Sequence, residues 1–295
     1  DGRELWVANL LQAGRADQFG VLAAAAVVTV VDTRTFQTAQ VRLITGSTSL
    51  RGIAFTPDGK YVLLTHLVAR YHMPTIRVDS GWMTANALTV MDVGRREVLN
   101  TVLLDDFSEG AANPWGVACT ADGRWICVSH AGTNELSVID AQELLAYLQD
   151  LPLEAFSNAA FFDGGSDGYG TVKNGEDVVN VPGFLAGIRQ RVKLPGVGPR
   201  GLAVCGSQVY VAEYFTDSIA AVALPAEKGA AVGSLALGEK PQWNEVRRGE
   251  MLFHDGRLCL EGWQSCASCH PEGRADALNW DLLNDGEGNP KNTLS

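Results

Sequence analysis

The chain has 295 residues, which is enough to bury a large core and to form about two domains. Its net charge of −11 argues against nucleic acid or an anionic membrane surface as a partner. No apolar run reaches the roughly 18 residues that a membrane-spanning helix needs, because the longest one extends only from Val21 to Val31.

An internal repeat organises residues 1–240. Residues 51–66 align with residues 115–130 at an offset of 64 without a gap, and a third copy at residues 200–213 is shortened at its turn. Each copy reads as an apolar strand, an Asp-Gly or Gly-Ser turn and a second strand, which is a hairpin signal. Third strands are expected at 87–92, 135–140 and 218–222, and fourth strands at 98–103, 190–194 and 231–237.

Four short antiparallel strands that recur in this way predict the blades of a β-propeller in a mainly β chain. The copies resemble the surface-layer-type (YVTN-like) propeller repeat. A β-sandwich is the alternative, but it does not predict a gap-free repeat. Asp1 aligns with Asp58 at a turn, so we expect three complete blades and most of a fourth at residues 4–45. Missing blades or another chain are then expected to complete the ring.

Three insertions interrupt the predicted blades, at residues 10–26, 68–86 and 141–189. The third opens with a predicted helix at 142–151, in which Leu144 and Leu148 share a face. Loops are where a propeller carries function. The insertions are therefore expected to cover one face of the propeller.

Residues 241–295 read as a second domain, with Asn244 as the N-cap of its first helix. Cys266, Cys269 and His270 form a C-x-x-C-H motif, the attachment signal of a covalent c-type haem. Two cysteines three positions apart lie on one side of a helical turn, and the histidine that follows can ligate iron. The rival interpretations are a zinc site, which would need a second ligand pair, and a thioredoxin-like motif, which would need a βαβ context.

The segments around this motif resemble the opening of a bacterial di-haem cytochrome c peroxidase domain. The same superfamily includes the enzymes that mature methylamine dehydrogenase. The resemblance covers residues 245–295 and is carried by Gly249-Glu-Met-Leu-Phe253 and Cys266-Ala-Ser-Cys-His270. It implies a partial, α-helical cytochrome c domain with haem c bound through Cys266 and Cys269 and with His270 as the proximal ligand. The family has a second C-x-x-C-H motif, whereas this chain has one. Covalent haem attachment implies a periplasmic or cell-surface bacterial protein.

The distal iron ligand stays open. His66 and His130 occupy the same repeat position, so each is either a repeat residue that hydrogen-bonds within its blade or a ligand offered by the propeller. His254 precedes the motif and is either a packing residue or the nearest alternative ligand.

Other residues near the motif have two interpretations each. Trp263 and Trp280 would pack on a porphyrin, and an electron-relay role is the sharper hypothesis. Arg274 either pairs with a haem propionate through its planar guanidinium or faces solvent. Residues 284–289 place oxygens at every second position, as in a calcium loop or a glycine-rich turn.

These patterns predict an extracytoplasmic haem protein for electron transfer or peroxidase-type oxidation, with iron bound by His270. The propeller would be the scaffold and partner-binding platform, and a redox protein or small electron donor would be the partner. The alternative is a propeller that serves binding or adhesion and carries an accessory or unloaded haem domain.

Overall fold

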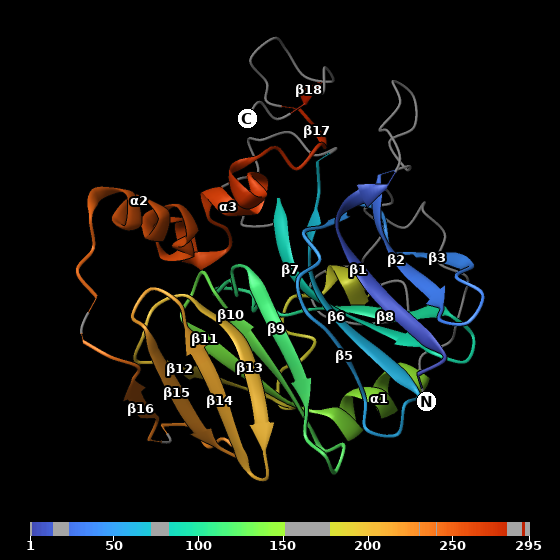
Figure 1. The fold of residues 1–295 in the computed structure, drawn as a ribbon, viewed down its shortest axis with the longest axis horizontal. Coiled ribbons are helices and arrows are strands. Elements are labelled where there is room, and N and C mark those ends of the chain that lie inside the picture. Colours follow the sequence, from blue (N-terminus) through green and yellow to red (C-terminus); the bar gives the residue numbers. More distant parts are fainter. Residues whose placement is uncertain are drawn as a thin grey trace.

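The computed structural model describes residues 2–13, 24–71, 83–150, 178–229, 231–239, 241–281 and 291–292. Four antiparallel sheets follow one another along the chain, and each is built from strands that lie close together in sequence (Figure 1). The four sheets fan out side by side, as propeller blades do. The chain is therefore mainly β with a propeller-like arrangement, as the repeat predicts.

The first two sheets are formed by residues 4–103. The first contains β1 (Glu4–Ala13), β2 (Ala25–Asp32) and β3 (Thr38–Arg42). The second contains β4 (Ser47–Thr48), β5 (Ile53–Phe55), β6 (Tyr61–Ala69), β7 (Thr84–Asp92) and β8 (Glu97–Leu103).

The third and fourth sheets have four strands each. The third contains β9 (Pro114–Cys119), β10 (Trp125–His130), β11 (Glu135–Asp140) and β12 (Arg189–Lys193). The fourth contains β13 (Pro199–Cys205), β14 (Gln208–Glu213), β15 (Ser218–Ala223) and β16 (Gly233–Ala236).

The hairpin of β6 and β7 is longer than the repeat predicts. Its register runs unbroken from Tyr61 opposite Asp92 to Ala69 opposite Thr84. Residues 68–69 and 84–86, expected in an insertion, are strand instead, since nearly every side chain here is buried and apolar or β-branched.

Neighbouring sheets meet through a repeated contact at their innermost strands. A Cβ atom on Gly52 would lie 2.4 Å from the carbonyl oxygen of Trp115, and the Thr65 hydroxyl donates to that same oxygen at 2.6 Å. The contact recurs one blade later, where a Cβ on Gly116 would lie 2.5 Å from the carbonyl oxygen of Arg200. Glycine is required at both positions because the next backbone comes so close.

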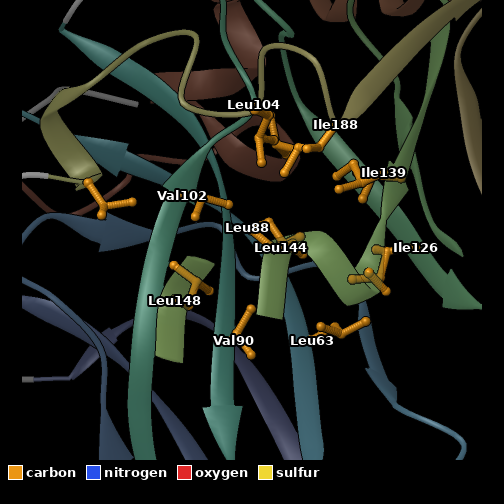
Figure 2. Close-up of a cluster of buried hydrophobic side chains, with 14 of the residues drawn as sticks. Leu63, Leu88, Val90, Val102, Leu104, Ile126, Ile139, Leu144, Leu148 and Ile188 are labelled. Atoms are coloured by element: carbon orange, nitrogen blue, oxygen red, sulfur yellow. The ribbon is translucent and has the colours of Figure 1, made fainter. Parts of the chain in front are cut away.

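The main core lies between the second and third sheets (Figure 2). The helix α1 (Ala141–Asp150) packs Leu144 and Leu148 into it, as their helical spacing predicts. Burying two leucines of this kind stabilises the fold by about 2 kcal/mol each. The other labelled members are Leu63, Leu88, Val90, Val102, Leu104, Ile126, Ile139 and Ile188.

Residues 241–281 lie across one end of the sheets, with α2 and α3 on the same side of the molecule (Figure 1). They form α2 (Glu245–His254), the single turns η3 (Gly256–Leu258) and η4 (Leu260–Gly262), α3 (Cys266–Cys269) and η5 (Pro271–Gly273). The short strands β17 (Asn279–Trp280) and β18 (Lys291–Asn292) follow. Another 3-10 turn, η2 (Val178–Asn180), precedes β12.

Asn244 caps α2 as predicted, because its side chain accepts a hydrogen bond from the Arg247 N–H at 2.8 Å. The predicted helical cytochrome c domain is not shown, since α2 is the one helix of more than a single turn among the described residues of this segment. Within the described part of the chain, no helix is both long and apolar enough to cross a membrane.

Candidate functional site

The C-x-x-C-H motif forms a single helical turn, α3, that ends at His270. Ser265 precedes the turn, and its N–H donates to the Ser268 hydroxyl at 3.0 Å. The Cys266 side chain is exposed and that of Cys269 is half-buried. Both are free thiols, one helical turn apart.

The His270 imidazole is oriented by a backbone group. Its Nδ1 lies 3.1 Å from the carbonyl oxygen of Arg274. Because a carbonyl can only accept, Nδ1 is the donor in this contact, and Nε2 is the ring nitrogen that it leaves for a ligand. This is how a metal-ligating histidine is usually held, with the nitrogen that does not bind the metal donating to a carbonyl.

Cys269 faces a cluster of buried apolar side chains behind the turn. It packs against a buried cluster that includes Tyr71, Met83 and Trp280. Burial raises the pKa of the Cys269 thiol to about 12, with a further contribution from the nearby Asp276 carboxylate. The thiol is therefore protonated at neutral pH in this conformation.

Asp276 ties the end of the turn to the residues that follow it. Its carboxylate accepts from the Leu278 N–H at 3.0 Å and from the Trp280 indole N–H at 2.8 Å. Its own N–H donates to the Cys269 carbonyl at 3.1 Å. Trp280 is thus fixed beside Cys269.

Asn113, at the start of the third sheet, contacts both serines of the turn. Its Nδ2 donates to the Ser265 hydroxyl at 2.7 Å, and its Oδ1 accepts from the Ser268 hydroxyl at 2.8 Å. The two serines bracket Cys266. All of these polar groups are buried, so each hydrogen bond satisfies atoms that water does not reach.

A buried carboxylate organises the propeller side of this contact. Asp105 is 0% exposed and accepts from the Asn86 N–H at 2.7 Å, the Asn86 side chain at 2.8 Å and the Ala111 N–H at 2.8 Å. The same Asn86 side chain donates to the Trp263 carbonyl at 2.9 Å, and its Oδ1 accepts from the Asn113 N–H at 2.9 Å. Burial raises the pKa of Asp105 to about 6, and the donors oppose that rise.

Two glycines allow the backbones to meet. A Cβ on Gly110 would lie 2.4 Å from the Trp263 Cα, and one on Gly256 would lie 2.5 Å from the Ala112 Cβ. The Gly110 N–H donates to the Glu261 carbonyl at 2.8 Å. Residues 110–113 therefore form the propeller edge on which the C-terminal segment sits.

His66 and His130 do not fit the role of distal ligand. The ring nitrogens of His66 contact the Leu67 carbonyl at 3.0 Å and the Thr89 hydroxyl at 2.6 Å. Those of His130 contact the Ala111 carbonyl at 3.1 Å and the Ser137 hydroxyl at 2.7 Å. Both rings are fully buried, which lowers the pKa of His66 to about 4 and that of His130 well below its usual value. They are repeat residues that join strands.

His254 lies nearer the motif. It is 8% exposed, its Nδ1 lies 2.9 Å from the Glu250 carbonyl, and burial lowers its pKa. It lines a small pocket whose wall includes Ala267 of α3 and Trp115. Of the three candidate histidines, this one shares a pocket with the turn.

The remaining predicted residues have different positions. Trp263 is 1% exposed and lies in the contact with the propeller. Arg274 is exposed, and its backbone carbonyl accepts the hydrogen bond from His270 Nδ1. The predicted calcium loop at 284–289 lies outside the described residues. Among the residues that are described, no three or more His, Cys, Asp or Glu side chains gather as metal ligands.

The fold defines a protein of β-propeller type. No model of a known protein family matches this sequence. The chain is 24% identical over 183 residues to hydrazine synthase subunit beta of Kuenenia stuttgartiensis, covering 61% of this chain and 42% of that protein. It is 49% identical over 49 residues to hydrazine synthase subunit gamma of the same organism, covering 16% of this chain and 14% of that protein.

A solved structure of Kuenenia stuttgartiensis hydrazine synthase superposes with a TM-score of 0.58 at 19% identity, covering 77% of this chain and 57% of its own. This likeness shows the propeller fold. The chain spans less than half the length of either curated subunit that it matches.

These comparisons correct the prediction from residues 245–295. The resemblance to di-haem cytochrome c peroxidases is wrong, because the similarity found is to subunits of hydrazine synthase. The predicted function in electron transfer or peroxidase-type oxidation is wrong for the same reason. The β-propeller part of the prediction is confirmed as a fold.

Proposed function

We propose that the chain is a β-propeller component of an enzyme complex of the hydrazine synthase type. The observation that carries this proposal is the match over 183 residues to one subunit of that enzyme, together with a second, more similar segment in another of its subunits. The likeness of the fold to a chain of the solved enzyme supports it.

An uncovered sheet face supports a protein partner. On β13, β14 and β15, Ala203, Tyr210 and Ala221 lie opposite one another on one face. Leu235 on β16 adds a side chain that is 63% exposed. The opposite face of this sheet packs into the core. A further β-sheet is the occupant that such a face accepts in a propeller.

Affinity purification from cells that contain hydrazine synthase tests the assembly. A tagged chain should recover other subunits of the enzyme, as identified by mass spectrometry. The double variant Tyr210→Glu/Leu235→Glu should recover them at least tenfold less well, because each buried carboxylate would be desolvated without a partner. Phe36→Glu is the matched control, since Phe36 is an exposed aromatic side chain on a turn of the first sheet. Recovery of the chain alone would contradict the proposal.

We further propose that Cys266 and Cys269 bind haem c through thioether bonds and that His270 is its iron ligand. Two thiols one helical turn apart, one of them exposed, and an imidazole whose Nδ1 is held by a carbonyl fit the group. Haem would supply an iron centre to the complex. The chain's own contribution would be to hold the ring through Cys266 and Cys269 and to orient His270 through the Arg274 carbonyl.

Covalent attachment is measured on a denaturing gel and by a pyridine haemochrome spectrum. The chain is expected to carry haem when it is exported to the periplasm with haem-attachment machinery, which is where we propose that it resides. Cys266→Ala should lose the covalent haem, and Cys205→Ala should keep it, because Cys205 is an exposed thiol on the fourth sheet. Colourless protein with both motif thiols free to alkylation would contradict this assignment.

A further inference from the structure

We propose that Asn113 is a positioning residue whose amide fixes the Cys266–His270 turn on the propeller, so that the third sheet sets where the two thiols and the imidazole lie. The proposal concerns the turn itself and goes beyond haem attachment. A failed haem test therefore leaves it standing.

The repeat shows that this position does not need an amide for its own structure. The aligned copies of the repeat begin at Arg51, Trp115 and Arg200. The residue two positions before each has a positive φ: 54° at Ser49, 56° at Asn113 and 68° at Gly198. Glycine adopts this left-handed conformation at no steric cost, and asparagine visits it more readily than most residues. The backbone thus asks only for a residue that tolerates it, and sister blades use serine and glycine.

The backbone of Asn113 is also held by a hydrogen bond that recurs at the equivalent position of the next copy of the repeat. The Asn113 N–H donates to Asn86 Oδ1 at 2.9 Å, and the Gly198 N–H donates to Asn134 Oδ1 at 2.8 Å. Both donors are blade residues, and both acceptors come from the preceding sheet. This shared hydrogen bond uses only the backbone N–H of Asn113, so it does not account for the side-chain amide.

The side-chain amide of Asn113 instead forms hydrogen bonds with residues of α3 and its N-cap. It donates to the Ser265 hydroxyl at 2.7 Å and accepts from the Ser268 hydroxyl at 2.8 Å, one contact at each end of the turn. Ser265 and Ser268 are 9% and 1% exposed, so water does not compete for these groups. A polar pair of this kind fixes both the axial position and the rotation of a short helix.

α3 needs such external support. It spans the four residues Cys266–Cys269, and isolated helices shorter than about 12 residues are marginal in water. Its buried side chains, Ala267 and Ser268, face the propeller. The propeller surface under α3 therefore determines where Cys266, Cys269 and His270 lie.

Thiol alkylation tests the proposal on the chain made without haem. N-ethylmaleimide labelling followed by peptide mass spectrometry gives separate rates for Cys269, which is half-buried, and for Cys205, which is exposed on the fourth sheet. In Asn113→Gly, the residue of the sister blade, we expect Cys269 to react about tenfold faster, because two buried hydrogen bonds that hold the turn are lost. The Cys205 rate and the thermal midpoint of the propeller should stay close to wild type.

Ser49→Gly is the matched control. It makes the same kind of change at the equivalent position, and among the described residues the Ser49 hydroxyl has no hydrogen-bond partner. Its Cys269 rate should match wild type. An unchanged Cys269 rate in Asn113→Gly, or an equal rise in Ser49→Gly, would overturn the proposal.

Ser268→Ala removes the other partner of the hydrogen bond between Asn113 and Ser268. It provides a second test if Asn113→Gly does not fold. It should also speed Cys269 alkylation, and the effects of the two substitutions should be less than additive in the double variant, because both remove the bond between Asn113 and the Ser268 hydroxyl. Fully additive effects in the double variant would show that Asn113 and Ser268 act separately and would overturn the proposal.

Discussion

The side-chain amide of Asn86 donates to the carbonyl oxygen of Trp263 at 2.9 Å, which joins the second sheet of the propeller to a residue 177 positions further along the chain. Both residues are buried. Asn86 also binds Asp105 and the Asn113 N–H, so one side chain connects two sheets and the C-terminal segment. The segment that carries the C-x-x-C-H motif is thus built onto the propeller.

Asn86→Ala should destabilise the chain strongly. It would leave the Trp263 carbonyl, the Asp105 carboxylate and the Asn113 N–H short of a partner, at a cost of about 3 kcal/mol in unfolding free energy. Urea unfolding followed by fluorescence measures the change. Asn9→Ala is the control, because Asn9 makes its hydrogen bonds within the first sheet. It should cost about 1 kcal/mol and leave Cys269 protected from alkylation. A loss in Asn86→Ala no larger than in the control would argue against its connecting role.

Gly110→Ala should displace the C-terminal segment. The added Cβ would meet the Trp263 backbone at 2.4 Å, and overpacking of this kind costs about 1–3 kcal/mol. Limited proteolysis should cut residues 245–281 faster in this variant. Gly201→Ala on β13 is the matched control, because a Cβ there would have no described atom within 4 Å. Equal cleavage rates in the two variants would contradict the observed packing.

Asp105 should make stability fall as pH rises between about 4 and 6. Burial raises its folded pKa to about 6 from the ordinary 3.8, so in this window the folded state holds a proton that the unfolded state has lost. This stabilising contribution is complete below about pH 4 and is lost as pH passes through 6. Its size is on the order of 3 kcal/mol, because each pKa unit corresponds to about 1.4 kcal/mol.

The difference in unfolding free energy between wild type and Asp105→Asn isolates that contribution, because other titrating groups cancel. We expect wild type to lose stability relative to the variant between pH 4 and pH 7 in urea unfolding experiments. Parallel pH profiles for the two proteins would show that Asp105 titrates normally.

His66 should make the stability of the chain fall as pH decreases, which is the opposite of the effect of Asp105. Burial lowers its folded pKa to about 4 from 6.5, so the unfolded state takes up a proton first as pH falls. The stabilising contribution of the neutral ring is present above about pH 6.5 and is lost as pH falls toward 4. In His66→Gln the acid-induced loss of stability should be smaller than in wild type, and haem content should be unchanged. A loss of bound haem at neutral pH in folded protein would return His66 to the list of iron ligands.

Most of the fold that could be predicted from the sequence was predicted from its internal repeat. The alignment of residues 51–66 with 115–130 located hairpins that the structure confirms as β5–β6 and β9–β10. It also placed His66 and His130 at one repeat position, which fits the strand-joining contacts that both make. Local pattern was sufficient because each blade is a local unit.

The contact between the propeller and the C-terminal segment could not be predicted in this way. Asn113 and Ser265 are 152 positions apart, and nothing in the spacing of either indicates the other. The available signal was that asparagine replaces the Ser49 and Gly198 of sister blades. The error in functional class came from the short motif, which specifies a candidate cofactor but not the enzyme that uses it.

The most direct measurement of the central claim is the hydrazine-forming activity of the complex purified with and without this chain. We expect the complete complex to form hydrazine and the complex lacking this chain to lose most of that activity, with recovery when the chain is added back. Undiminished hydrazine formation without the chain would contradict the proposal that it is a component of this enzyme.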